Sequence, residues 1–326
     1  MQPIIKVIGV GGSGSNTVSR MEKFKMQGIE LLAVNTDAQA LFFSNGRPQG
    51  LKKILIGKNI TNGLGTGMNA DLGRKAAEES KQEITEAICG GPASGPKGQP
   101  ASAGKADMVF VTCGLGGGTG SGASPIIADI SKGLGILTIG VVTTPFSFEG
   151  AERKKVADLA LKNLREKVDS LLIISNDKLL KVINEKTTVS SAFSICDEVL
   201  REAVQSITDL ILVPGIINID FASVVSIMRN SGQSIFGVGK ASGENRAVVA
   251  AENAISSPLL DCSIKGSKAV LFSASGNDVT LNEIQEAAKI ITKNVDSKAQ
   301  IIFGAVKDGS LKKGEIKITV IATKLA

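Results

Sequence analysis

Three glycine-rich stretches contain most of the candidate binding residues of this chain. The richest, "GGGTGSG" at 116–122, closely follows the apolar run "MVFVTC" at 108–113. Backbone N–H groups with no side chains in front of them can wrap an anion, and a following helix adds its positive dipole end. Thr119 and Ser121 would add hydroxyl donors. This stretch therefore predicts a phosphate-binding loop.

The other two stretches also precede predicted helices. "GVGGSG" at 9–14 satisfies GxGxxG, and Asp37 follows at the end of the next predicted strand. Alone, this pattern also fits a tight strand-to-helix turn or the dinucleotide site of a NAD-dependent oxidoreductase. The third stretch is "GLGTGMN" at 63–69, and the P-loop pattern GxxxxGK[ST] does not occur in the sequence. Three such loops on one sheet favour a ligand with several phosphates.

The composition excludes several classes of site. The 326 residues include no histidine, and the four cysteines (Cys89, Cys113, Cys196 and Cys262) form no CxxC pair. A histidine-ligated metal and a Ser–His or Cys–His nucleophile are therefore impossible, and a disulfide framework is disfavoured. We predict no metal-ligating residues and expect a cytoplasmic protein with reduced thiols.

The net charge of +6 does not indicate a nucleic-acid partner. The lysines are scattered, at most in pairs, and there is no tryptophan or tyrosine to stack on bases. Solvated helix faces explain these charges better. The sequence also has no signal peptide and no apolar run of about 18 residues, so we expect no direct membrane insertion.

The elements that must position the glycine loops alternate along the first half of the chain. Apolar runs predict strands at 4–10, 29–36, 108–113, 135–143 and 170–175. Helical patterns lie between most of them, at 71–88, 123–134 and 151–168. This alternation is typical of an α/β fold with a parallel sheet covered on both faces.

The second half of the chain differs in pattern. A long helix is predicted at 189–212, before Pro214 and Gly215, and more alternating strands follow at 267–275, 299–306 and 315–323. These indicate a smaller mixed α/β domain. The Gly/Pro-rich segment at 91–104 predicts a flexible surface loop.

Many segments together resemble the FtsZ family, the bacterial cell-division GTPases of the tubulin superfamily, over essentially the whole chain. "GGGTGSG" is similar to the superfamily signature GGGTG[ST]G, and "VIGVGGSGSNTV", "AVNTDAQAL", "TPFSFEGAER" and "GENRAVVAAENAISSPLL" lie in the family's order. The resemblance implies a Rossmann-like GTP-binding domain at 1–188, a central connecting helix at 189–213 and a C-terminal domain at 214–326.

The resemblance also implies a binding site for GTP or GDP, with Mg²⁺ on the phosphates. The phosphate contacts would come from Gly11, Gly12, Ser13, Gly14, Ser15, Asn16, Thr66, Gly67, Met68, Asn69, Gly117, Gly118, Thr119 and Gly120. Glu149 and Arg153 would hold the ribose, and Asn176, Phe193 and Asp197 would form the guanine pocket. Without the resemblance, Phe193 could be a core residue, and Glu149 and Arg153 a surface pair spaced i, i+4.

Hydrolysis is expected to need a second copy of the chain. In the family, a loop corresponding to "GIINIDFASV" (215–224) reaches the GTP of the next subunit, and head-to-tail stacking gives a filament. Asn218 and Asp220 match the family pattern, whereas Ser223 stands where the family has an acid. The resemblance thus implies a polymerising GTPase at the division site. The alternative is a GTP-binding filament protein with little hydrolysis.

Other partners follow from the resemblance alone. It implies contacts with division-machinery proteins and membrane tethers. In the family these contacts use a linker and a C-terminal peptide, which do not follow the last predicted strand in this sequence.

Overall fold

The computed structural model forms two compact units. Unit 1 comprises Met1–Leu171 and Ser175–Val204, and unit 2 comprises Leu172–Ile174 and Gln205–Ala326. The structure describes residues 2–23, 28–42, 50–91, 104–179, 187–213, 215–257, 263–309 and 311–324. Apart from its two end residues, the predicted loop at 91–104 lies outside the described residues. The domain boundaries at 188 and 213 stay a prediction.

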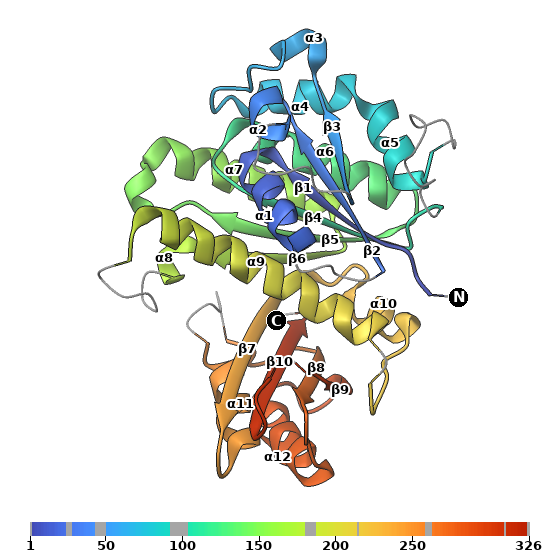
Figure 1. The fold of residues 1–326 in the computed structure, drawn as a ribbon, viewed down its shortest axis with the longest axis vertical. Helices are drawn as coiled ribbons and strands as arrows, with labels where there is room; N and C mark the ends of the chain where they lie inside the picture. Colours follow the sequence, from blue (N-terminus) through green and yellow to red (C-terminus); the bar gives the residue numbers. More distant parts are fainter. Residues whose placement is uncertain are drawn as a thin grey trace. The chain divides into compact units, whose positions relative to one another are not determined.

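Unit 1 contains the predicted parallel sheet (Figure 1). Its strand order is β3 (Leu51–Leu55), β2 (Ile29–Asn35), β1 (Ile5–Val10), β4 (Met108–Gly114) and β5 (Leu137–Thr144), and all these neighbours pair in parallel. The chain moves outward in opposite directions from β1 and from β4. Such a reversal leaves a crevice at the carboxyl ends of these two strands, where ligands of open α/β sheets bind.

The helices of unit 1 connect these strands. They are α1 (Gly11–Lys23), α2 (Ala38–Phe42), α3 (Lys58–Thr61), α4 (Ala70–Glu79), α5 (Lys81–Cys89), α6 (Gly118–Gly133), the 3-10 helix η1 (Ser147–Glu149), α7 (Ala151–Lys167) and α8 (Asn176–Leu179). Strand β6 (Ser170–Ser175) precedes α8, and the long helix α9 spans Val189–Leu212. The predicted single helix at 71–88 is wrong, because the chain breaks at Ser80. The buried hydroxyl of Ser80 accepts a hydrogen bond from the Gly57 N–H at 3.1 Å.

Two of the predicted glycine loops are largely helical. Helix α6 begins at Gly118 rather than near residue 123, and α1 begins at Gly11, inside the first glycine-rich stretch rather than after it. Close packing explains this difference. A Cβ on Gly122 would lie 1.9 Å from the Ala70 carbonyl oxygen at the start of α4, and one on Gly14 would lie 2.4 Å from the Thr112 carbonyl oxygen. These glycines let helices approach their neighbours, in addition to any role toward a ligand.

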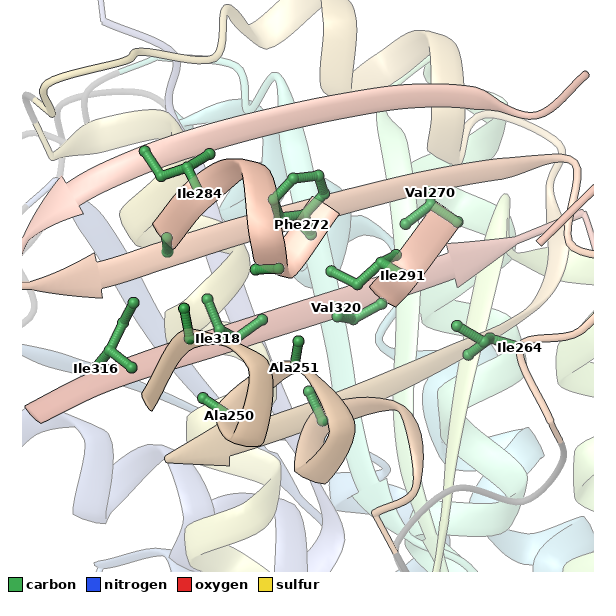
Figure 2. Close-up of a cluster of buried hydrophobic side chains, with 14 of the residues drawn as sticks. Ala250, Ala251, Ile264, Val270, Phe272, Ile284, Ile291, Ile316, Ile318 and Val320 are labelled. Carbon is green, nitrogen blue, oxygen red and sulfur yellow. The ribbon is translucent and has the colours of Figure 1, made fainter. Parts of the chain in front are cut away.

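Unit 2 contains a mixed sheet, and two of its helices pack on one face. The strand order is β7 (Gly232–Ser242), β10 (Glu315–Thr323), β8 (Ala269–Gly276) and β9 (Gln300–Lys307), of which only β8 and β9 pair in parallel. Helices α11 (Arg246–Ile255) and α12 (Leu281–Thr292) pack on it through the apolar cluster shown in Figure 2, which includes Phe272, Ile284 and Ile318. Helix α10 (Phe221–Met228) and strand β7 were not predicted from the sequence.

The long helix at 189–212 and the later strands are confirmed. Within the part of the chain that the structure describes, no helix has the length and apolar character needed to cross a membrane.

Candidate functional site

A cavity of about 230 Å³ lies in unit 1 and includes residues from the carboxyl ends of β1 and β4. The structure brings together in its wall many of the predicted site residues: Gly11, Gly12, Ser13, Thr66, Gly117, Gly118, Thr119, Gly120, Glu149, Arg153, Asn176, Phe193 and Asp197. The cavity thus lies at the topological switch point of the sheet. The roles of the individual lining residues stay predictions.

Six predicted residues do not line the cavity: Gly14, Ser15, Asn16, Gly67, Met68 and Asn69. Gly14 and Ser15 are buried in α1, whereas Asn16 is exposed. Asn69 is the N-cap of α4, and its side chain accepts a hydrogen bond from the Leu72 N–H. The loop before α4 therefore contributes only Thr66 to the cavity wall.

The start of α6 provides the anion-binding geometry that the sequence predicts. Gly117 is the N-cap, and no side chain caps this end of the helix. The first N–H groups of a helix have no partner within the helix, so those of α6 are available to an anion in the cavity. Gly116 adopts φ of +96°, and its N–H donates to the Ser121 hydroxyl at 2.9 Å. Ser121 thus shapes the loop.

The hydroxyl of Thr119 is part of a chain of three threonines. It lies 2.6 Å from the Thr36 hydroxyl and 3.2 Å from the Thr66 hydroxyl, and all three side chains are buried. The sequence predicted a hydroxyl directed at phosphate. In the structure this hydroxyl also links the loop before α4 to the start of α6, so it holds two glycine-rich loops together.

Substitutions at Thr119 test this link. Thr119→Ser keeps the hydroxyl and is expected to retain most nucleotide binding. Thr119→Val leaves the Thr36 and Thr66 hydroxyls without this partner and is expected to weaken binding about tenfold, because a lost buried hydrogen bond costs about 1–3 kcal/mol. Titration with GDP measures both variants. Equal affinities would contradict a role for the hydroxyl.

Another part of the cavity wall is formed by residues of α8 and α9. Asn176 is buried, and its Oδ1 atom has no hydrogen-bond partner among the described residues. Phe193 is 40% exposed and meets the buried Phe146 ring edge-on, with ring centroids 5.4 Å apart. An unpartnered buried acceptor costs free energy, which a ligand donor would recover.

Asp197 is the acidic group of this wall, and two residues of α1 contact it. The Thr17 hydroxyl donates to Oδ1 at 3.0 Å, and the Arg20 guanidinium lies 3.4 Å from Oδ2. Burial raises the pKa of the Asp197 carboxyl, while the charge of Arg20 and the hydrogen bond from Thr17 act in the opposite direction. Asp197 is therefore a buried acceptor whose charged form is supported from α1.

Glu149 and Arg153 form an ion pair at the cavity wall, with Oε2 and Nη1 2.6 Å apart. The other oxygen of Glu149 accepts a hydrogen bond from the Phe146 N–H at 2.9 Å. The pair is thus fixed to the turn that carries Phe146, which in turn contacts Phe193. The i, i+4 ion pair does not exclude a role in binding, because both residues line the cavity.

Asn218, Asp220 and Ser223 lie in unit 2, and none of them lines the cavity. Asn218 accepts from the Gly215 N–H at 2.6 Å, and Asp220 is the N-cap of α10, accepting from the Ser223 N–H at 3.2 Å. Ile217 pairs with Ala305 of β9 through backbone hydrogen bonds. The loop at 215–220 is therefore held in a defined conformation.

Several residues of the site were not predicted from the sequence. The cavity is also lined by Val10, Gly114, Leu115, Thr143, Pro145 and Cys196. Thr17 and Arg20 lie on α1, and their partner Asp197 is far away in the sequence, so no local pattern indicated them. Within the described part of the chain, no group of three His, Cys, Asp or Glu side chains could hold a metal ion.

Two family models and several solved structures match this chain. A model of the GTPase domain of the tubulin/FtsZ family matches residues 4–184, and one of the FtsZ family C-terminal domain matches residues 232–326. An empty FtsZ dimer from M. jannaschii is similar at 40% identity and a TM-score of 0.89, over 99% of this chain and 88% of that chain. A GTPγS-bound protofilament of CetZ2 from Haloferax volcanii is similar in fold, at 22% identity and a TM-score of 0.79, over 99% and 92% of the chains.

Proposed function

This chain belongs to the tubulin/FtsZ family, and from that membership we propose that it binds and hydrolyses GTP and assembles head to tail into filaments. Membership of the family supports a GTPase domain and GTP hydrolysis in general terms. The assembly, the site of hydrolysis and the biological role are the parts that we propose.

The observation that carries the proposal is that one cavity is lined by two kinds of chemistry. The uncapped N-terminus of α6 and the glycine backbone suit phosphates. The Asp197 carboxylate and the unpartnered Oδ1 of Asn176 are both acceptors. Guanine presents N1–H and a 2-amino group as adjacent donors, whereas adenine does not, so these acceptors favour GTP over ATP. A NAD site would use only the first glycine loop.

Three further residues of the cavity wall would orient the bound nucleotide. Glu149 and Arg153 would hold the ribose, and Phe193 would lie against the base. Mg²⁺ fits the site only in part, because the described residues contain no cluster of acidic ligands. Phosphate oxygens and water would therefore supply most of its ligands, as is usual for this ion. Its charge would stabilise the phosphates.

Water activation is proposed to come from a second subunit. The cavity wall has Glu149 and Asp197 as its acids, and both are assigned to the ribose and the base. Asn218 and Asp220 lie exposed on unit 2, on a loop fixed by Ile217. A repeated heterologous contact that brings this loop to the next cavity generates an open filament. The dimeric state of the M. jannaschii relative supports self-association.

We propose a role in cell division, with division-machinery proteins and membrane tethers as partners and a mid-cell location. The FtsZ-type C-terminal domain supports this assignment over other members of the superfamily. A second candidate is a GTP-binding filament protein with little hydrolysis. Ser223 favours it, because a serine lacks the charge that an acid would place beside Asp220.

Mixing two inactive variants tests catalysis across the subunit boundary. Asp220→Asn keeps an N-cap for α10, since asparagine caps as well as aspartate, but removes the charge. Asp197→Ala damages the cavity and leaves the loop intact. Each variant alone is expected to release little phosphate from GTP. A mixture is expected to recover activity, because some contacts join an intact cavity to an intact loop.

The control is the concentration dependence of the parent protein. Its phosphate release is expected to rise more steeply than linearly with protein concentration. If the mixture co-sediments as filaments and still releases no phosphate, catalysis between subunits is wrong. A rate strictly linear in protein concentration would contradict the shared site as well.

A further inference from the structure

We propose that Thr17 and Arg20 of α1 are the positioning residues for guanine recognition, because they hold the Asp197 carboxylate with one acceptor position of each oxygen free for the base. This inference rests on the proposed function. It adds two specificity-determining residues that touch neither base nor phosphate in that proposal.

The two contacts are divided evenly between the carboxylate oxygens. Oδ1 accepts from the Thr17 hydroxyl at 3.0 Å, and Oδ2 lies 3.4 Å from the Arg20 guanidinium. An ionised carboxylate has about four acceptor positions, two on each oxygen. One position on each oxygen therefore remains for the cavity that Asp197 lines. Two adjacent acceptors match the two adjacent donors of guanine, N1–H and the 2-amino group.

Arg20 also fixes the helix that carries Asp197. Its guanidinium donates to the Ser194 carbonyl oxygen at 3.2 Å, one turn before Asp197 on α9. The same side chain thus contacts the backbone and the carboxylate of α9 from α1. Thr17 is fully buried, and Ser13 O is a second acceptor 3.0 Å from its hydroxyl. Both residues therefore restrict where the carboxylate can point.

The charge of Asp197 depends on the same two residues. Arg20 on α1 acts on Asp197 electrostatically, and Asp197 and Glu149 both act on the neighbouring Cys196 thiol of α9. Burial raises the pKa of the Cys196 thiol to about 12, so this group is neutral at neutral pH. Burial raises the pKa of Asp197, and Arg20 and Thr17 counter that rise. A protonated carboxyl would lose one of the two acceptors that guanine needs.

Paired titrations with GDP and IDP separate recognition from folding. Hypoxanthine in IDP keeps N1–H but lacks the 2-amino group, so the ratio of the two dissociation constants reports the second acceptor. We expect the parent to prefer GDP about tenfold or more, since hydrogen bonds to charged groups are the stronger ones. Thr17→Val and Arg20→Gln are expected to reduce this preference at least about fivefold.

The conservative variants and the pH profile complete the test. Thr17→Ser restores the hydroxyl and Arg20→Lys the charge, so each is expected to recover most of the preference. In Thr17→Val and Arg20→Gln the pKa of Asp197 is higher, so GDP affinity is expected to fall at a higher pH than in the parent as the pH is lowered. Ser19→Ala and Lys23→Gln are matched α1 controls, because neither residue contacts Asp197, and both are expected to behave like the parent.

The outcomes distinguish this inference from the proposed function. A parent that binds neither GDP nor IDP would overturn the proposed function. A parent that prefers GDP, with Thr17→Val and Arg20→Gln retaining both the preference and the pH profile, would overturn the positioning role alone. Equal losses for GDP and IDP in the two variants would also overturn it, because they would indicate general damage to α1.

Discussion

Asp197→Asn is expected to weaken GTP binding about 10- to 100-fold and to create binding of XTP. The loss follows because a charge-assisted hydrogen bond contributes about 1.5–3 kcal/mol, and the new amide NH₂ opposes a guanine donor. Xanthine carries a carbonyl where guanine has the 2-amino group, so it accepts from that NH₂. Competition titrations with GTP, XTP and ATP measure the change in preference.

The surroundings of Asp197 can accommodate the amide. Its oxygen would take the position next to Arg20, and its NH₂ the position next to Thr17. The Thr17 hydroxyl can accept from the NH₂ while it donates to the Ser13 carbonyl oxygen. The fold is therefore expected to survive, and the apparent melting temperature serves as the control. Parent-like GTP affinity in this variant would show that the guanine pocket lies elsewhere.

Ser223→Asp is expected to speed phosphate release about 10²-fold above the assembly threshold. Preorganised charge near the reacting atoms commonly contributes this much to the rate. GTP affinity is expected to change little, since Ser223 lies in unit 2 and does not line the cavity of its own chain. Steady-state phosphate release and GDP titration together separate the two effects.

We expect Ser223→Asp to leave the fold of α10 intact. Ser223 lies in the first turn of α10, where its N–H donates to Asp220, and an added carboxylate there interacts favourably with the helix dipole. Ala222→Asp is the matched control, because it adds the same charge at the neighbouring exposed position. If Ser223→Asp changes little and Ser223→Ala lowers the rate instead, the serine hydroxyl itself holds the water, and Asp220 suffices as the acid.

The sheet of unit 1 and the neighbourhood of the candidate site could be predicted from the sequence alone. Strands β1 and β4 are wholly or almost wholly buried, so they appear in the sequence as mainly apolar runs, interrupted in β1 by the buried Lys6. The glycines after them could be recognised for the same local reason, because a loop at a strand end needs bare backbone to hold phosphate. Both signals depend only on residues close together in the chain.

Contacts between groups that are far apart in the chain became visible only in the folded protein. Position 122 of α6 has no room for a side chain, because the Ala70 carbonyl oxygen of α4 lies too close. The Thr119 hydroxyl lies within hydrogen-bond distance of the Thr36 and Thr66 hydroxyls. The sequence pattern gives no sign of such partners.

The same limit applies to the acidic group of the site. The orientation and charge of Asp197 depend on Thr17 and Arg20, which come far earlier in the chain. Hydrogen bonds and close contacts act over a few ångströms in space, whereas sequence patterns report only periodicity along the chain. The motifs therefore located the site, and the packing of α1 against α9 decided how its carboxylate is held.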